Sequence, residues 1–204
     1  LGVMAYVALS CLTHYVLIPE PPPSADFFPR QGHVIVNSVA GETVRILKDR
    51  YSGDPSLVEI DVLLEPGRSV PMPHIHIGMT EVFTALEEQT NLVISGNIRS
   101  LQPGESITIH EGVPHQPFNP GKVSSRVKVS LQPVGFFDLC LVSIHGLLTK
   151  PEEERGWLVT QMQLARYATF CNIYRVDIPV WLQQSGLFFA DPTLRLLGFR
   201  RWEE

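Results

Sequence analysis

The chain has 204 residues and a mass of 22.8 kDa, and it is 44% hydrophobic and 18% charged. This composition supplies enough apolar material for a folded core, and the length fits one domain with extensions. Sixteen Lys and Arg against 21 Asp and Glu give a formal charge of −5. No basic surplus is therefore available for phosphate contacts, and we expect no nucleic-acid partner.

Residues 1–18 form an apolar segment without a charged side chain, apart from the titratable His14. As a helix this segment would be about 27 Å long, close to the ~30 Å hydrocarbon core of a bilayer. Three interpretations stay open: the remnant of a signal or anchor, a helix on a membrane surface, or a strand or helix packed on the domain. Because the chain begins at Leu1, we expect the natural N-terminus to lie upstream. The Pro-rich residues 19–30 cannot continue a helix and predict an extended connector.

Residues 34–133 consist of short runs rich in Val, Ile and Thr, such as ETVRIL, SITIHE and SSRVKVSLQ, several of which alternate polar with apolar positions. Turn-forming segments such as SGDPS, EPG and NPGK separate these runs, and the chain contains 17 Pro and 15 Gly. Strands that recur roughly every ten residues, with no helix between them, indicate an antiparallel sandwich or barrel.

Within this region three histidines and one glutamate have the spacing of metal ligands. His74 and His76 are two residues apart, so on a strand both imidazoles lie on the same face. A turn at residues 78–79 lets the strand that carries Glu81 run back beside them, and His115 follows from a later segment. Three imidazoles and one carboxylate suit one divalent transition metal such as iron, manganese, nickel or zinc, whereas calcium needs more oxygen ligands. An octahedral metal with four protein ligands keeps two neighbouring positions for a substrate.

These residues stand in two motifs, GRSVPMPHIHIGMTE at residues 67–81 and GESITIHEGVPHQPFN at residues 104–119. In both motifs the sequence resembles the cupin family, whose fold is a double-stranded β-helix, or jelly roll. Every metal-ligand position of the family pattern is filled. The departures are His110 for a proline, Glu88 for a glycine, and Gly67 one residue early, and they affect turns rather than ligands.

The resemblance covers about half of the chain and implies its organisation. We expect a mainly β fold with a cupin barrel over residues 31–135. Residues 1–30 precede the barrel as the apolar segment and connector, and residues 136–204 follow it as a helical extension. The resemblance also implies that the metal is held by four side chains: His74, His76, Glu81 and His115.

Side chains on the same faces as the ligands predict a mostly apolar substrate pocket for a small organic molecule. The predicted pocket residues are Val70, Met72, Phe83, Ala85 and Phe118. The alternative is that these are ordinary interior residues of the barrel. His110 lies at a strand end near the predicted pocket mouth, where it is either a general base or partner of the site, or a solvated turn residue.

The C-terminal region changes from β to helical patterning. A helix is predicted to open with PEEER at residues 151–155 and to continue through WLVTQMQLARYATF, and two further helices are predicted at residues 179–190 and 193–202. We expect these helices to cover the open face of the β domain. The alternative is contact with a membrane surface, since the last helix combines an apolar face with Arg195, Arg200 and Arg201.

The three cysteines, Cys11, Cys140 and Cys171, are far apart in the sequence and lie in apolar surroundings. Their odd number predicts buried free thiols rather than a disulfide framework, which favours a reducing compartment. We therefore expect an intracellular protein, either cytoplasmic or membrane-associated.

The function predicted first is a metal-dependent enzyme acting on a small, largely apolar organic molecule. Cupins with three histidines and one glutamate include dioxygenases, and also isomerases, lyases and cyclases that use the metal as a Lewis acid. The resemblance favours oxygenase-type chemistry, with Glu81 and His110 as the candidates for proton transfer. A non-catalytic protein that binds a small ligand is the alternative from another class. Pairing of exposed sheet edges also makes a homodimer an expectation.

Overall fold

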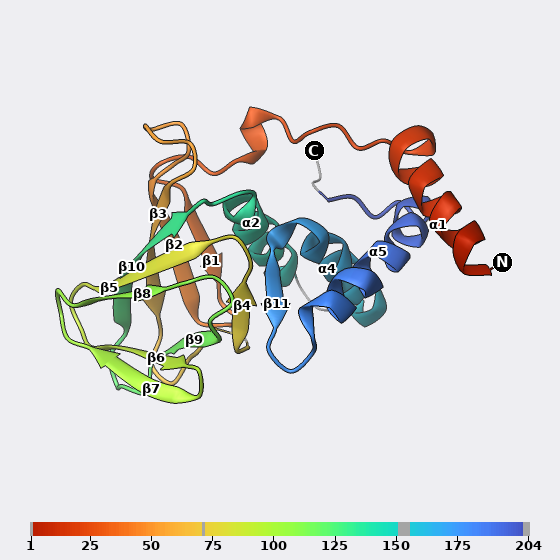
Figure 1. The fold of residues 1–204 in the computed structure, drawn as a ribbon. Helices are drawn as coiled ribbons and strands as arrows, with labels where there is room; N and C mark the ends of the chain where they lie inside the picture. Colours follow the sequence, from red (N-terminus) through yellow and green to blue (C-terminus); the bar gives the residue numbers. More distant parts are fainter. Residues whose placement is uncertain (1, 71, 151–155, 202–204) are drawn as a thin grey trace.

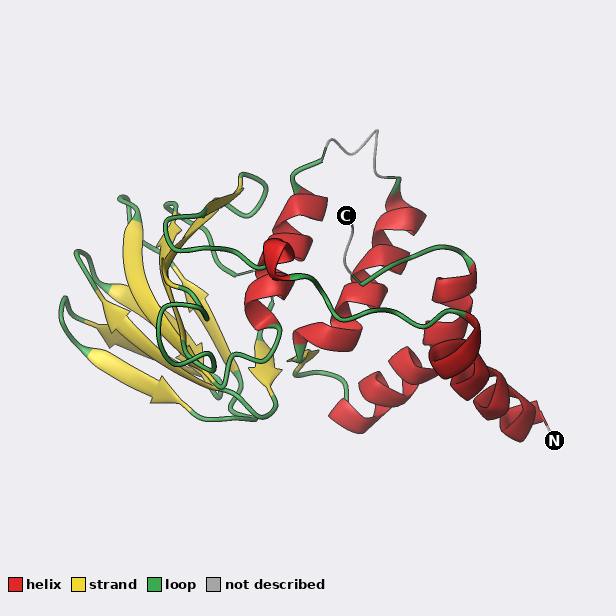
Figure 2. Cartoon of the chain, turned by 90° about the horizontal axis from the view of Figure 1, so that it is seen from above, coloured by secondary structure: helices red, strands yellow, loops and turns green. Residues whose placement is uncertain are grey.

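The computed structural model describes residues 2–70, 72–150 and 156–201. The described chain forms a β barrel of two antiparallel sheets and, beside it, a layer of helices from both ends of the chain (Figure 1). The N-terminal helix α1 (Gly2–Leu12) lies on the side of this layer that faces away from the barrel (Figure 2).

Each sheet pairs strands that are distant in the sequence, as in a jelly roll. The six-stranded sheet has the order β1 (Val34–Asn37), β2 (Glu42–Lys48), β3 (Val58–Leu64), β10 (Ser125–Gln132), β5 (Thr80–Ala85) and β8 (Ser106–Ile109). The five-stranded sheet has the order β11 (Ile173–Arg175), β4 (His74–His76), β9 (His115–Phe118), β6 (Thr90–Ile94) and β7 (Asn97–Leu101). The mainly β jelly-roll fold expected from the sequence is confirmed.

The barrel core follows directly from the alternation of side chains along the strands. In β5 and β10 every second residue is buried, and the antiparallel register sets Val129 opposite Phe83 and Leu131 opposite Glu81. The buried core as a whole consists mostly of β-branched and aromatic residues, which suit a pleated and half-buried surface. Glu81 therefore occupies a position that its neighbours use for the apolar core.

Both ends of the chain meet in the helical layer. A π-helical turn at Thr13–Leu17 follows α1, and a short 3-10 turn at Ala25–Phe27 interrupts the Pro-rich connector, with Ser24 and Phe28 extended on either side of it. The Tyr6 hydroxyl donates to the Phe189 carbonyl oxygen, so the N-terminal segment is packed on the C-terminal helices. Among the described residues, no helix has the length and apolar character needed to cross a membrane.

The C-terminal helices are α2 (Phe137–Leu148), α4 (Trp157–Cys171) and α5 (Val180–Leu196). The predicted helix opening at residues 151–155 lies outside the described residues, as does residue 202 at the end of the last predicted helix. The prediction of separate helices at residues 179–190 and 193–202 is wrong, because α5 continues through Pro192. Asp191 and Arg195 flank this proline and form a buried ion pair. Tertiary contacts of this kind outweigh the local preference of proline to end a helix.

A disulfide joins Cys140 of α2 to Cys171 of α4, with the two Cα atoms 5.2 Å apart, whereas Cys11 is exposed. The prediction of three buried free thiols is therefore wrong. The two cysteines are 31 residues apart in sequence, and only the packing of α2 against α4 brings them together. The argument for a reducing compartment, which depended on free thiols, loses its basis.

Candidate metal centre

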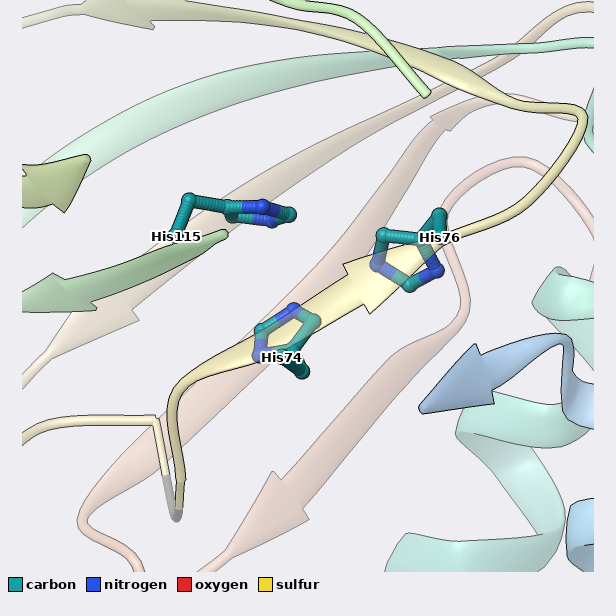
Figure 3. Close-up of side chains that lie close together, drawn as sticks. All are labelled: His74, His76 and His115. Carbon is teal, nitrogen blue, oxygen red and sulfur yellow. The ribbon is translucent and has the colours of Figure 1, made fainter. Parts of the chain in front are cut away.

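Three histidines lie together between the two sheets. His74 and His76 are the first and last residues of β4, and His115 begins β9, where it pairs directly with His74. The ring centroids are 5.0 Å apart for His74 and His76, 4.4 Å for His74 and His115, and 5.6 Å for His76 and His115. One ring nitrogen from each residue lies within 4.8 Å of those of the other two. Figure 3 shows the three rings gathered around one small space.

Glu81 reaches the same place from β5 of the opposite sheet. Its Oε2 atom is 2.6 Å from Nε2 of His115 and 3.7 Å from Nε2 of His76. Glu81 is 5% exposed, and His74, His76 and His115 are 5%, 2% and 2% exposed. The structure thus brings together the four side chains that the sequence motifs single out.

Each histidine ring is oriented by a main-chain carbonyl oxygen that accepts from its Nδ1 atom. The acceptors are Met72 for His74 at 2.9 Å, Asn172 for His76 at 3.3 Å and Val113 for His115 at 3.0 Å. Donation from Nδ1 leaves Nε2 as the nitrogen that can bind a metal. The main chain therefore presets all three rings in the same tautomer.

The atoms that face one another in the cluster lack hydrogen-bond partners. Within the described part of the chain, Nε2 of His76, Nε2 of His115 and Oε2 of Glu81 are buried and unpartnered. His115 and Glu81 are close enough for an ion pair, but their geometry does not make a hydrogen bond. Buried polar atoms without partners are costly, so their convergence indicates that a further group completes the site. The donor set fits a borderline divalent transition metal.

The electrostatics of the cluster agree with this fit. Burial, together with the neighbouring His115 and His76, lowers the pKa of His74 to about 3. Burial also lowers the pKa of His76, against the opposing charge of Glu81. For Glu81, burial favours the neutral acid, but the three imidazoles outweigh it and lower the pKa. For His115, burial favours the neutral ring, but the Glu81 carboxylate outweighs it and raises the pKa. The cluster thus presents the Glu81 carboxylate and the neutral imidazoles of His74 and His76, whereas the charge of Glu81 favours the protonated form of His115, from which a cation would displace the proton.

Two glycines shape the turns that lead to the ligands. Gly78, between β4 and β5, has φ +71°, and Gly112, before β9, has φ +73°, a region that residues with a Cβ atom rarely adopt. The amide of Gly112 donates to the carbonyl oxygen of His76 at 2.8 Å, and the amide of Gly78 donates to the Glu111 carboxylate at 2.7 Å. The turns and the ligand strands are therefore tied together.

The predicted pocket residues differ in where they lie. Phe83 is buried with its ring centroid 5.9 Å from that of His115, and Ala85 is buried on the same face of β5. Val70 and Phe118 are partly buried, and Met72 is exposed and reaches the site through its carbonyl oxygen.

His110, the second candidate for proton transfer, has an exposed side chain at the turn after β8. The structure does not place it among the buried ligand side chains. Its position matches the solvated turn residue that the sequence analysis left open as the alternative.

Two residues that contribute to the site were not predicted from the sequence. The Phe137 ring of α2 packs edge-on against the His76 ring, with 4.8 Å between centroids. Asn172 ends α4 in a left-handed conformation with φ +54°, and its side-chain amide donates to the Ile77 carbonyl oxygen. Both residues belong to the C-terminal region, and no motif spacing relates them to the histidines.

Comparison with known proteins identifies the domain that carries the cluster. The sequence model of the family described as Cupin domain matches residues 60–130, a range that contains all four clustered side chains. A search of curated proteins finds no match.

Several solved structures are similar to the chain. They include KdgF from Halomonas sp., at 19% identity over 54% of this chain and 94% of that chain, with a TM-score of 0.44. The Cupin_2 domain of an XRE family transcriptional regulator from Enterobacter cloacae is 18% identical over 45% and 96%, with a TM-score of 0.40. The polyketide cyclase RemF from Streptomyces resistomycificus is 23% identical over 56% and 80%, with a TM-score of 0.42. Likenesses at this level carry no argument about activity. From the family match and the jelly-roll topology we conclude that residues 60–130 belong to a cupin domain.

Proposed function

We propose that His74, His76, Glu81 and His115 hold one divalent transition metal, and that the chain is a metal-dependent enzyme acting on a small, largely apolar organic molecule. The observation that carries this proposal is the convergence of buried ligand atoms without partners, from rings that main-chain carbonyl groups have already oriented. A histidine cluster with a structural role alone would satisfy these atoms within the protein.

The chain's own residues prepare the site for such chemistry. When bound, a divalent metal supplies Lewis acidity, which polarises a carbonyl group or lowers the pKa of a bound hydroxyl group. Glu81 offsets part of the positive charge and is, among the described residues, the buried carboxylate of this cluster that can accept a proton. The rings of Phe83 and Phe137 lie against His115 and His76 and exclude water, which strengthens electrostatic interactions in the site.

The apolar character of these surroundings supports an apolar substrate. Chemistry with O2 stays a prediction from the cupin resemblance. A non-oxidative isomerase, lyase or cyclase is the alternative that the test below separates from it.

The test combines metal analysis with turnover. We expect the purified chain to contain about one transition-metal ion per molecule, and His115→Ala to lower metal affinity by well over tenfold, since even partners that only orient a ligand contribute about 10–100-fold. His33→Ala removes an exposed histidine outside the cluster and serves as the matched control. A wild-type chain that contains no metal and takes up none would refute the proposal.

The reaction type is tested on phenolic and enolic substrates with an oxygen electrode. Oxygen uptake that stops with His115→Ala supports the oxygenase. Turnover that continues unchanged without oxygen removes the oxygenase and leaves the Lewis-acid enzyme.

A further inference from the structure

A cavity lies in the helical layer, outside the cupin barrel. It has a volume of about 320 Å³ and is lined by residues of α1, α4 and α5 and of the turns that follow α1 and α5. This volume is at the lower end of cavities that bind small molecules, about 300–1,000 Å³. The N-terminal helix α1 lies beside α5 there (Figure 1), so segments from opposite ends of the chain line the cavity.

A group of ion pairs lies beside this cavity, and two of its members, Asp191 and Arg201, line it. Arg166 pairs with Asp191 at 2.5 Å and also with Glu20. Arg195 pairs with Asp191 at 2.7 Å and with Glu20 at 3.3 Å. Arg201 is the third guanidinium, with its Nε atom 3.5 Å from Glu20. Among the described residues, three guanidinium groups thus face two carboxylates, and one positive charge is left without a counterion.

Arg201 is the guanidinium that lines the cavity. Its Nε atom donates to the Thr169 hydroxyl at 3.0 Å, and its amide donates to Glu20 at 3.3 Å. In the part of the chain that the structure describes, its two Nη groups have no partner. Burial and then the charge of Arg166 lower the pKa of Arg201, against the opposing effect of Glu20. A planar pair of free N–H groups suits two-point binding of a carboxylate.

Other donors and apolar surfaces line the same cavity. The Ser10 side chain is 4% exposed, and its Oγ atom has no hydrogen-bond partner among the described residues. Arg195 donates to Nδ1 of His14 at 2.8 Å, which places the ring proton of His14 on Nε2 as a further donor. The rings of Tyr15 and Phe188 also line the cavity and offer apolar surface.

We propose that this cavity binds a small organic acid, with its carboxylate on Arg201 and an aromatic or other apolar body against Tyr15 and Phe188. The one positive charge that has no counterion among the described residues matches a single negative charge. The nearby Asp191 carboxylate, which also lines the cavity, disfavours a dianion. This site requires neither the metal nor the histidine cluster.

The probe is 1-naphthoate, titrated into the full chain by calorimetry, with the uncharged 1-naphthalenemethanol as the matched control ligand. We expect one molecule of naphthoate to bind per chain. The alcohol should bind at least about tenfold more weakly, since hydrogen bonds to a charged group are worth about 1.5–3 kcal/mol. Arg201→Gln should lower naphthoate affinity by a similar factor. His115→Ala should leave it unchanged, which separates this site from the metal centre.

Three results would overturn the proposal: no naphthoate binding by the folded wild-type chain, equal affinity for acid and alcohol, or loss of binding in His115→Ala. The comparison of the two ligands on the wild-type chain requires no variant, so it decides the question even if Arg201→Gln fails to fold.

Discussion

At the scale of single residues, the site consists of side chains that the sequence predicts and main-chain groups that it does not. His74, His76, Glu81 and His115 could be predicted because residue spacing on a strand determines which side chains share a face. The carbonyl groups that orient the rings leave no such signal, since every residue carries one. Asn172 is 96 positions from His76 and contributes its carbonyl oxygen, so only the fold reveals it.

Glu81 is the residue for which the metal proposal makes the sharpest prediction. Glu81→Gln keeps the shape of the side chain but removes its charge, so we expect metal affinity to fall by about tenfold or more, as expected for losing a charged ligand. Competition with a chromophoric chelator measures this. Glu88→Gln, an exposed position in the turn after β5, is the control. An unchanged affinity in Glu81→Gln would show that the carboxylate is not a ligand.

At the scale of elements, strands with alternating patterns were predictable, and elements defined by tertiary contacts were not. The strand β11 pairs with β4, with Ile173 opposite His76 and Arg175 opposite His74. It has three residues, which is too short for an alternating pattern to be recognised in the sequence. Helix α2 is apolar on nearly every side, in the segment FDLCLVSIHGLL, and contains a glycine. Its sequence therefore lacks the periodicity by which a surface helix is predicted.

The disulfide between α2 and α4 provides the test at this scale. Replacing both Cys140 and Cys171 by Ala removes a link that spans 31 residues, which should lower the free energy of unfolding by about 3–4 kcal/mol. Cys171 directly precedes Asn172, so metal affinity should fall as well. Urea unfolding and chelator competition measure the two effects, with Cys11→Ser as the control at an exposed cysteine. Titration of three free thiols in the oxidised native protein would contradict the disulfide.

At the scale of the whole molecule, the barrel and the helical layer share one core. Phe137, Cys140, Tyr167 and Cys171 belong to the same cluster of buried side chains as the barrel strands. The domain boundaries drawn from the sequence, membrane association and a homodimer stay predictions. Large apolar side chains on α1 and α5, such as Met4 and Trp181, are 73% and 67% exposed, but nothing in the structure shows what covers them.

The shared core predicts how an isolated barrel behaves. A fragment of residues 31–135 lacks β11 and α2, so the edge of β4 becomes exposed and Phe137 no longer covers His76. An uncovered strand edge favours association with other chains. We expect this fragment to aggregate in size-exclusion chromatography, whereas the full chain elutes as a defined species. A monodisperse fragment that binds metal as tightly as the full chain would show that the barrel is independent.

The position of β11 also sets the order in which the protein matures during synthesis. The segment that matches the cupin domain ends at residue 130, yet the last carbonyl group that orients a ligand belongs to Asn172. Because the ribosome releases a chain from its N-terminus, the barrel strands emerge with an open edge beside two of the histidines. The proposed metal centre is therefore completed only when Asn172 and the β11 residues that follow it have left the exit tunnel.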